Sequence, residues 1–282
     1  MNEVRGIKRL AYLYKTLQRE DFRILHAIER GMVYLEDIAT FTKMDLKDVS
    51  YFLGRLSKIK LVEYHEERYN LKYSGLDMLS LGYLYENNAI KAVGDQIGYG
   101  KESDVFESIG NGDEEGVLKV HREGISFKNV LKNRPGMSKE EWVKISKKSA
   151  FREQKALKRL YPYVSVPKPI ASNRHVNVMG RIDGCQLNRA DLEDPGWFLD
   201  KILDEVEKSY ERGIIHGDLS KYNVLVSNGE VFLIDWPQYV ETGFGGSEEI
   251  LKRDIKIIIN HFSRKYSLNT DLEGAFKRIT RR

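Results

Sequence analysis

The stretch GIIHGDLSKYNVLV at residues 213–226, followed after a short turn by VFLIDWPQ at residues 231–238, decides the fold that we expect. It contains an apolar turn, Asp218, then Asn223 five residues later, two strands joined by a hairpin, and Asp235 after the second strand. Asp and Asn in turns often cap only backbone groups. The coincidence of these spacings in one chain order makes capping alone a poor explanation.

Phosphoryl transfer requires these residue types. One carboxylate orients the attacking hydroxyl, whereas an amide and a second carboxylate hold the magnesium ion that bridges the nucleotide phosphates. The spacing Asp-x-x-x-x-Asn, with Ile-Asp 17 residues after the first Asp, matches the catalytic and metal loops of kinases. We therefore predict phosphotransferase chemistry, and we expect His216 to be a buried structural histidine that braces the loop.

Two motifs upstream are candidates for binding nucleotide phosphates. A glycine hairpin at Gly98 and Gly100 lets backbone N–H groups approach phosphates, although most such hairpins are merely turns. Lys119 lies in an apolar strand 19 residues after Gly100, where an antiparallel strand places it under this hairpin. Glu153, on a helix with a core stripe over residues 149–160, is the carboxylate that we expect to hold Lys119. Taken separately, an exposed strand lysine and an exposed helix glutamate are the plainer interpretations.

The segment VNVMGRIDG at residues 176–184 falls between two predicted lobes, where a kinase hinge belongs. We expect Met179 to line an adenine pocket, with backbone groups of Gly180 and Ile182 meeting the edge of the base. A methionine in a strand is more often a plain core residue. The order of the motifs along the chain favours the hinge.

Residues 1–89 predict a winged helix-turn-helix domain. The expected elements are helices over residues 11–17, 22–32, 35–41, 45–59 and 75–86 and a β-hairpin with its turn near residues 66–68. Asp45 is a good N-cap for the expected recognition helix. The Lys and Arg residues of this helix fit nucleic-acid contact and a solvated face equally well, and winged helices also dock proteins.

The composition bounds the remaining interpretations. The 282 residues are 41% hydrophobic and 31% charged, which suits soluble domains with real cores, and we expect neither a membrane span nor a signal peptide. Because Cys185 is the single cysteine, an internal disulfide is excluded and a reducing cytoplasm is favoured. The net charge of +4 conceals residues 119–159, which hold 13 Lys and Arg against 4 Asp and Glu and include a predicted long mobile loop.

These motifs resemble those of the RIO family of atypical serine/threonine protein kinases. The shared motifs are GKES-x-V from Gly100, HGDLS-x-YN from His216 and ID-x-PQ from Ile234. With the winged helix, the resemblance is to the second subfamily and covers essentially the whole chain. His-Gly-Asp by itself is shared with enzymes of the aminoglycoside phosphotransferase type.

The resemblance implies an α+β fold class with two domains. A winged helix-turn-helix domain over residues 1–89 precedes a minimal bilobal kinase-like domain over residues 90–282. The kinase-like domain then has an N-lobe to about residue 178, a hinge at about 179–184 and a C-lobe from about 185.

The resemblance also implies ATP and Mg²⁺ as cofactors, with Mn²⁺ as a substitute. Asp218 becomes the catalytic base, Asn223 and Asp235 become the metal ligands, and Asp235 also accepts a phosphate transiently in an ATPase cycle. Lys119 counts among the catalytic residues because it holds phosphates. The implied ATP-binding residues are Gly98, Gly100, Lys101, Glu102, Ser103, Val105, Lys119, Glu153, Met179, Gly180 and Ile182.

The family is associated with late maturation of the small ribosomal subunit. The precursor of that subunit and its RNA are therefore the implied partners, contacted through the winged helix and the basic residues 119–159. Autophosphorylation is expected as well, with Ser126, Ser138 and Ser146 in the predicted loop as candidate sites. The implied compartment is the cytoplasm, with no membrane partner.

Departures from ordinary protein kinases restrict the function further. Gly217 replaces the catalytic-loop arginine, and the 47 residues after Asp235 leave no room for the usual peptide-binding subdomains. Trp236 stands where Phe is more usual in the subfamily, an exchange expected to leave the site intact. One alternative is a small-molecule phosphotransferase of the aminoglycoside-kinase type, which predicts a helical subdomain after Asp235. The other is a winged-helix, nucleic-acid-binding regulator that senses ATP, which predicts loss of Lys119, Asp218 or Asp235.

Overall fold

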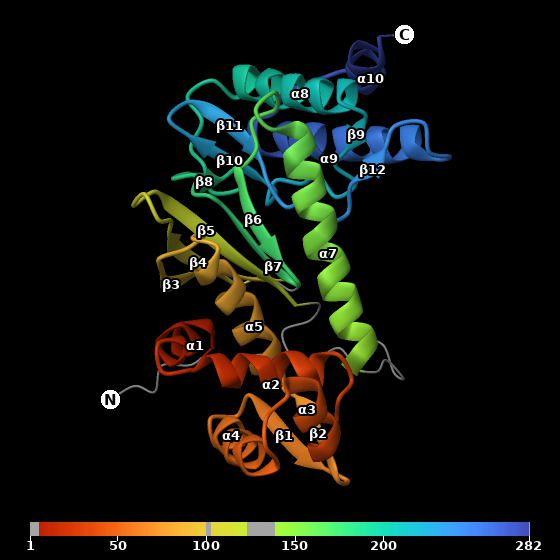
Figure 1. The fold of residues 1–282 in the computed structure, drawn as a ribbon. Helices are drawn as coiled ribbons and strands as arrows, with labels where there is room; N and C mark the ends of the chain where they lie inside the picture. Colours follow the sequence, from red (N-terminus) through yellow and green to blue (C-terminus); the bar gives the residue numbers. More distant parts are fainter. Residues whose placement is uncertain (1–5, 100–102, 123–138, 282) are drawn as a thin grey trace. The chain divides into compact units, whose positions relative to one another are not determined.

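The computed structural model describes residues 6–99, 103–122 and 139–281 (Figure 1). The chain forms two compact units. Of the described residues, the first unit holds 6–99 and 105–118, and the second holds 103–104 and 119–281. The domain boundary near residue 90, which rests on a change in the sequence pattern, is a different kind of division and stays a prediction.

The first unit begins with helices and a hairpin in the order expected of a winged helix-turn-helix. Its elements are α1 (Ile7–Tyr14), α2 (Arg19–Glu29), α3 (Leu35–Thr42), α4 (Leu46–Lys58), β1 (Val62–His65), β2 (Arg68–Leu71) and α5 (Tyr73–Glu86). The hairpin pairs Val62 with Leu71 and His65 with Arg68, so its turn falls at residues 66–67, as predicted. Helix α1 ends before residue 17, because the hydroxyl and the N–H of Thr16 both donate to the carbonyl of Leu13 and close the helix.

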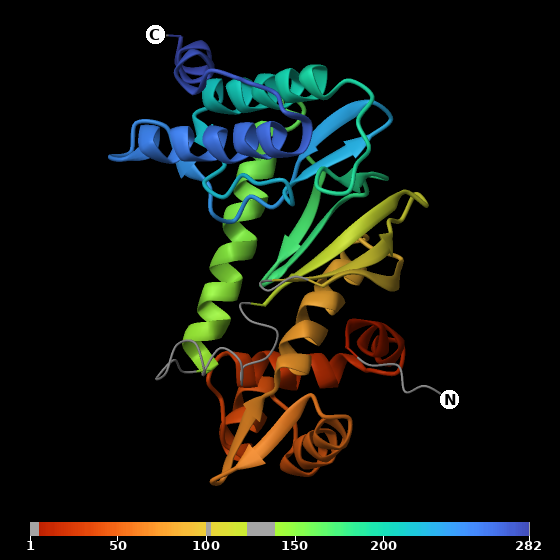
Figure 2. The same ribbon diagram turned by 180° about the vertical axis from the view of Figure 1, so that it is seen from behind.

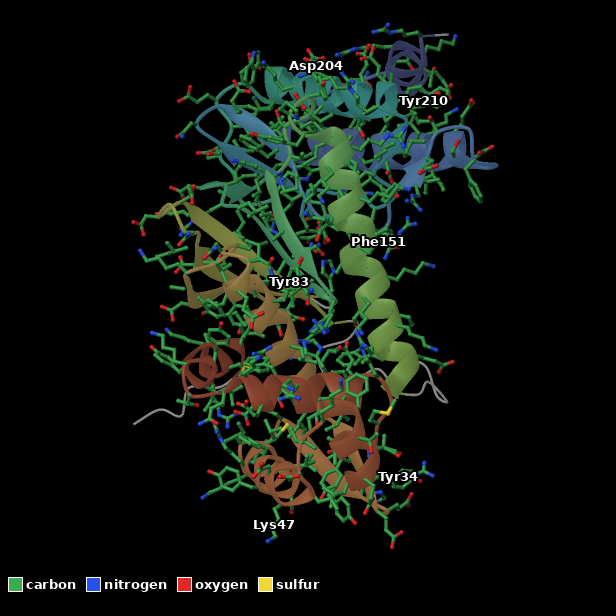
Figure 3. All side chains as sticks on the ribbon, viewed as in Figure 1. Tyr34, Lys47, Tyr83, Phe151, Asp204 and Tyr210 are labelled. Atoms are coloured by element: carbon green, nitrogen blue, oxygen red, sulfur yellow. The ribbon has the colours of Figure 1, made fainter. Side chains whose placement is uncertain are left out.

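A buried ion pair ties α2 to α4. Asp21 is fully buried, and its carboxylate lies 3.2 Å from the guanidinium of Arg55 and accepts the N–H of Gln18 at 2.7 Å. The side chain of Arg55 is 24% exposed and is held by this ion pair, so it is not a free cation on the surface of α4. Lys47 and Lys58 remain exposed on α4, and Figure 3 shows Lys47 pointing away from it.

Three strands continue the chain after α5. They are β3 (Ala92–Tyr99), β4 (Ser103–Ile109) and β5 (Glu115–His121). A Cβ at Gly98 would lie 3.2 Å from the Cβ of Val105, so glycine allows β3 and β4 to approach closely. Strand β5 belongs to both units, since the division falls between Leu118 and Lys119. With β6 (Pro169–Asn173) and β7 (Val176–Gly180), these strands have the order β3-β4-β5-β7-β6.

The second unit contains the loops that carry Asp218 and Asp235. Besides β6 and β7, its elements are α7 (Lys139–Leu160), β8 (Cys185–Gln186), α8 (Pro195–Glu211), β9 (Ile214–Ile215), β10 (Val224–Ser227), β11 (Glu230–Leu233), β12 (Val240–Glu241), α9 (Ser247–Tyr266) and α10 (Leu272–Thr280). Two small antiparallel sheets have the orders β11-β10-β8 and β12-β9. Helices α8, α9 and α10 pack together, and Figure 2 shows them gathered near the C-terminus.

The described part after Asp235 contains β12, α9 and α10 alone. Asp271 caps α10 by accepting the N–H groups of Glu273 and Gly274. Two helices at this position agree with the sequence and leave no separate substrate-binding subdomain among the described residues. Throughout the described ranges, every helix is too short or too polar to cross a membrane.

Candidate active site

A glycine shapes the loop between β9 and β10. Gly217 has φ of 81°, which L residues rarely adopt, and a Cβ at this position would overlap the carbonyl oxygen of Gln238. Both the backbone conformation and the lack of space therefore require glycine. The N–H of Gly217 donates to the buried carboxylate of Asp254 at 2.8 Å, and Arg253 donates to the Gly217 carbonyl. The residue that replaces the arginine of ordinary kinases is therefore locked between α9 and the segment after Asp235.

His216 connects the two predicted loops. Its Nε2 lies 3.0 Å from the carbonyl oxygen of Ile234, so this nitrogen carries the proton and donates. Its Nδ1 then accepts the backbone N–H of Asp218 at 3.4 Å, and the ring packs on Trp236 with centroids 4.4 Å apart. Burial lowers the pKa of His216, which keeps the ring neutral, as this pair of hydrogen bonds requires.

Asn223 uses its amide nitrogen to hold the same loop. Its Nδ2 donates to the backbone carbonyl oxygen of Asp218 at 2.8 Å, and the backbone carbonyl of Asn223 accepts the N–H of Ile234 at 3.0 Å. The Oδ1 atom of Asn223 is therefore the side-chain atom left to bind a cation. Asp218 is exposed, with its backbone fixed at both ends by His216 and Asn223.

A buried lysine joins two carboxylates that are distant in sequence. The Nζ of Lys119 lies 2.6 Å from Oε1 of Glu153 and 2.8 Å from Oδ1 of Asp235. The side chains of Lys119 and Glu153 are 9% and 1% exposed, whereas that of Asp235 is 39% exposed. Burial alone would lower the pKa of Lys119, but the charges of Asp235 and Glu153 outweigh it and hold that pKa well above its ordinary value.

Glu153 is the centre of a buried polar network. Its Oε2 lies 2.8 Å from Nε2 of His121 and accepts the amide of Asn177 at 3.1 Å, while Oε1 also faces the N–H of Trp236 at 3.4 Å. Burial disfavours the carboxylate, but Lys119 and His121 outweigh that cost and lower the pKa of Glu153. Glu153 thus stays ionised inside the protein and orients Lys119.

His121 and Asn177 belong to this network but were not predicted from the sequence as site residues. A signal existed for His121, since residues two apart on a strand point to the same face and Lys119 is two residues earlier. Asn177 gave no comparable signal, because a lone amide in the apolar strand β7 reads as an ordinary polar position.

The expected hinge, at about residues 179–184, begins within β7, whose last two residues are Met179 and Gly180. Met179 is buried, and the N–H of Gly180 donates to the carbonyl of Lys168 at 2.8 Å. The N–H of Gly180 is therefore already used, and only its carbonyl is left to meet the edge of an adenine base. Ile182 lies in the irregular segment after β7.

The remaining predicted nucleotide residues divide between described and undescribed parts of the chain. Gly98 lies on β3, Val105 lies on β4, and Ser103 is the first residue of β4. Gly100, Lys101 and Glu102 lie outside the described residues. The same holds for Ser126 and Ser138, whereas Ser146 lies on α7 and is buried, so its placement in the predicted mobile loop was wrong.

The ligand atoms at this site suit a magnesium ion. Asn223 Oδ1 and the carboxylate of Asp235 are hard oxygen donors, and Mg²⁺ usually takes one or two such ligands together with water and substrate phosphates. Among the described residues no cluster of three or more His, Cys, Asp or Glu side chains forms a closed metal cage. Asn223 and Asp235 as metal ligands stay a prediction.

Two family models match the chain, and each match lies within one of the two expected domains. The RIO domain matches residues 104–275, and the Rio2 N-terminal domain matches residues 14–87. The order of the motifs, with a buried lysine that contacts Asp235, is that of a kinase-type phosphotransferase. The chain belongs to the RIO family of atypical serine/threonine kinases and is of the Rio2 type.

Relatives and solved structures agree with this assignment. The chain is 36% identical to the RIO-type serine/threonine-protein kinase Rio2 of Methanocaldococcus jannaschii over 88% of this chain and 98% of that protein. It is 34% identical to serine/threonine-protein kinase rio2 of Dictyostelium discoideum over 93% of this chain, and it spans about half (53%) of that longer relative. The crystal structure of the Rio2 kinase–ADP/Mg²⁺–phosphoaspartate complex from Chaetomium thermophilum superimposes with a TM-score of 0.83 at 27% identity, covering 95% of this chain and 88% of that chain. The resemblance to the second RIO subfamily is thus confirmed.

Proposed function

We propose that this chain is an ATP- and magnesium-dependent serine/threonine kinase and ATPase that passes phosphate through Asp235. The observation that carries the proposal is the contact of the buried Lys119 ammonium with both Glu153 and Asp235. A fixed cation beside an exposed carboxylate neutralises charge where an anionic nucleophile meets an anionic phosphate. The Chaetomium thermophilum complex, which holds a phosphoaspartate, supports the same chemistry.

In the proposed first step, a carboxylate oxygen of Asp235 forms a bond to the γ-phosphorus of ATP. The bond from that phosphorus to the β,γ-bridging oxygen breaks, and ADP leaves with the electron pair. Lys119 neutralises charge on the phosphates, and a magnesium ion at this site would supply Lewis-acid stabilisation of them. Asn223 and Asp235 are the residues proposed to hold that ion.

In the proposed second step, Asp218 takes the proton of the hydroxyl that accepts the phosphate. The hydroxyl oxygen forms a bond to the phosphorus, and the bond from that phosphorus to the Asp235 oxygen breaks, which restores the carboxylate of Asp235. The acceptor is water in the ATPase cycle and a serine or threonine in protein phosphorylation or autophosphorylation. His216 and Asn223 fix the backbone of Asp218, so the carboxylate projects from a rigid loop into solvent. A rigid base lowers the cost of orienting the acceptor.

Substitution of Asp235 tests this mechanism. Asp235→Asn should abolish magnesium-dependent release of phosphate from ATP and all labelling by γ-labelled ATP, whereas Asp191→Asn, a change of an exposed aspartate outside the site, should leave both unchanged. Label on an aspartate is released by hydroxylamine, while label on serine is not. Full turnover or hydroxylamine-labile label in Asp235→Asn would contradict the proposed intermediate.

We also propose that the protein works in the cytoplasm on the small ribosomal subunit precursor. It contacts the RNA of that precursor through the winged helix and the basic residues 119–159. On α4, Lys47, Tyr51 and Lys58 recur at helical spacing, and Tyr51 is 67% exposed. On α7, Lys144, Lys148 and Lys155 flank Phe151, which is also 67% exposed. Cations beside exposed aromatic rings suit single-stranded or looped RNA, because its bases stack on the rings and its phosphates pair with the cations.

A binding measurement with small-subunit RNA tests this part separately. Neutralising Lys144 and Lys148 to Gln should weaken binding and lower its salt dependence, because each lost phosphate contact reduces the number of released counterions. Phe151→Ala should weaken binding with an unchanged salt slope. If neither change affects the affinity, the RNA surface on α7 is refuted while the ATP chemistry stands.

A further inference from the structure

A pocket of about 500 Å³ lies beside the catalytic loop and outside the proposed phosphoryl-transfer site. Its walls are Asn188, residues 220–222 of the loop, and side chains of α9 between residues 257 and 265. Ser220 is two residues from Asp218, so their Cα atoms lie within about 8 Å of each other. A chain held in the pocket therefore passes close to the proposed base.

The pocket is positively charged. Lys221, Arg264 and Lys265 line it, and no Asp or Glu does. Lys265 donates to the carbonyl of Ala190 at 2.9 Å, whereas among the described residues neither Lys221 nor Arg264 forms an ion pair. Two cations thus face the pocket with no carboxylate to neutralise them, which is the electrostatic signature of an anion site.

Two buried polar atoms in the wall lack hydrogen-bond partners among the described residues. They are Oδ1 of Asn188 and Nε2 of His261. Burial, together with Lys221 and Lys265, lowers the pKa of His261, so an anion in the pocket has the opposite effect and favours its protonation. Oδ1 of Asn188 needs a donor such as a peptide N–H, and the cations need an acceptor.

An acidic residue of a polypeptide offers both an acceptor for the cations and a donor for Asn188. Its carboxylate or phosphate accepts from Lys221 and Arg264, and its backbone N–H donates to Asn188. Exposed apolar surface at Tyr222 and Ile257 can contact the aliphatic parts of neighbouring side chains of the same polypeptide. The position beside Asp218 matches a peptide that brings its own hydroxyl to the proposed base.

We propose that this pocket binds an acidic residue, either Asp or Glu or a phosphorylated residue, next to the serine or threonine that accepts the phosphate. The inference rests on the proposed function, because it names the class of protein substrate for the same catalytic loop. It makes Arg264 and Lys221 determinants of substrate specificity rather than catalytic residues.

Fluorescence anisotropy with labelled peptides on the full chain tests the pocket. The probes are a Glu-Glu-Ser-Glu-Glu peptide, the same peptide with phosphoserine in place of each Glu, and a Gln-Gln-Ser-Gln-Gln peptide. Either charged probe should bind more tightly than the Gln probe, and Arg264→Gln should raise its Kd about 3- to 10-fold. The charged probe with the lower Kd shows whether a carboxylate or a phosphate is the natural anion.

Lys256→Gln provides the matched control. Lys256 is an exposed cation on the same helix, α9, and does not line the pocket, so its loss changes the net charge equally. Equal Kd values for the Glu, phosphoserine and Gln probes, or equal effects of Arg264→Gln and Lys256→Gln, would overturn the inference. Where a charged peptide is phosphorylated, Arg264→Gln should raise KM and leave kcat unchanged.

RNA is the rival occupant, and a ten-nucleotide oligouridylate probes it. Weaker RNA binding by Arg264→Gln with unchanged peptide binding would overturn the inference in favour of RNA. The outcome is separable from the proposed function, since Asp235→Asn tests ATP turnover without involving the pocket. Retained turnover in Asp235→Asn would refute the phosphoryl-transfer mechanism and leave the peptide-binding result standing.

Discussion

The Nζ atom of Lys119 lies 2.8 Å from Oδ1 of Asp235, although 116 residues separate the two in the chain. The same ammonium lies 2.6 Å from Glu153, so one buried cation is shared by two carboxylates. Asp235 has φ of 70°, a conformation that Asp tolerates better than most residues, and it keeps part of its side chain in solvent. The lysine thereby connects the interior network to the residue proposed to take the phosphate.

Glu153→Gln should destabilise the protein by about 3 kcal/mol, because it leaves a buried Lys119 with one carboxylate and disrupts the contacts of His121 and Asn177. Urea unfolding measures the loss. The exposed Glu241, which pairs with Lys155 at 3.4 Å, offers a control, and Glu241→Gln should cost less than about 1 kcal/mol. Similar losses in the two variants would mean that the network contributes little.

The stabilising effect of Glu153 should also depend on pH. Its pKa is held below the ordinary value of 4.5, so the folded state binds a proton less readily than the unfolded state. The stability difference between the wild type and Glu153→Gln should be constant above about pH 5 and shrink as the pH falls below 4.5. A difference that grows on acidification would contradict the direction of this shift.

His216→Gln should flatten the stability profile near neutrality. Burial lowers the pKa of His216, so the unfolded state gains its proton first and the wild type loses stability as the pH falls below about 6.5. Gln keeps an N–H for the Ile234 carbonyl but loses the ring packing on Trp236, which should cost about 1–2 kcal/mol at pH 8. Thermal or urea unfolding at pH 5.5 and pH 8 compares the two proteins, and identical slopes would show that His216 is not the group responsible.

Gly217→Ala and Gly229→Ala form a matched pair, since φ is 81° at Gly217 and 79° at Gly229. Nothing lies within 4 Å of a Cβ at Gly229, so that change should cost only about 1 kcal/mol of backbone strain. At Gly217 the added methyl overlaps the Gln238 carbonyl, and we expect a loss of about 3 kcal/mol together with most of the ATP turnover. Equal losses by unfolding would show that the loop can move away from the added methyl group.

Asp218→Asn should separate the two proposed steps. Removal of the base should slow ATP turnover by about 100-fold or more, because no group takes the proton of the accepting water. Transfer to Asp235 does not need that base, so hydroxylamine-labile label should persist longer after a chase with unlabelled ATP. Loss of label at the wild-type rate would remove Asp218 from the second step.

Much of this site was accessible to sequence reasoning because its residues lie in short, ordered motifs. Asp218, Asn223 and Asp235 fall within 18 consecutive residues whose turns and strands follow from local patterns. The winged-helix hairpin at β1 and β2 was accessible for the same reason, since alternation and a turn set its register. The ion pair of Arg55 with Asp21 was not accessible in this way, because it depends on how α2 packs on α4.

The sequence by itself determined the types and order of the chemical groups: a strand lysine, a helix glutamate, and the Asp, Asn and Asp of the two loops. Only the tertiary structure decided that Lys119 touches Asp235, that His121 and Asn177 complete the network around Glu153, and that α9 places Arg264 beside the catalytic loop. The physical reason is that such contacts depend on packing between segments far apart in the chain. Local patterns predict how a segment folds, whereas these charges meet only where separate elements bury their apolar faces against one another.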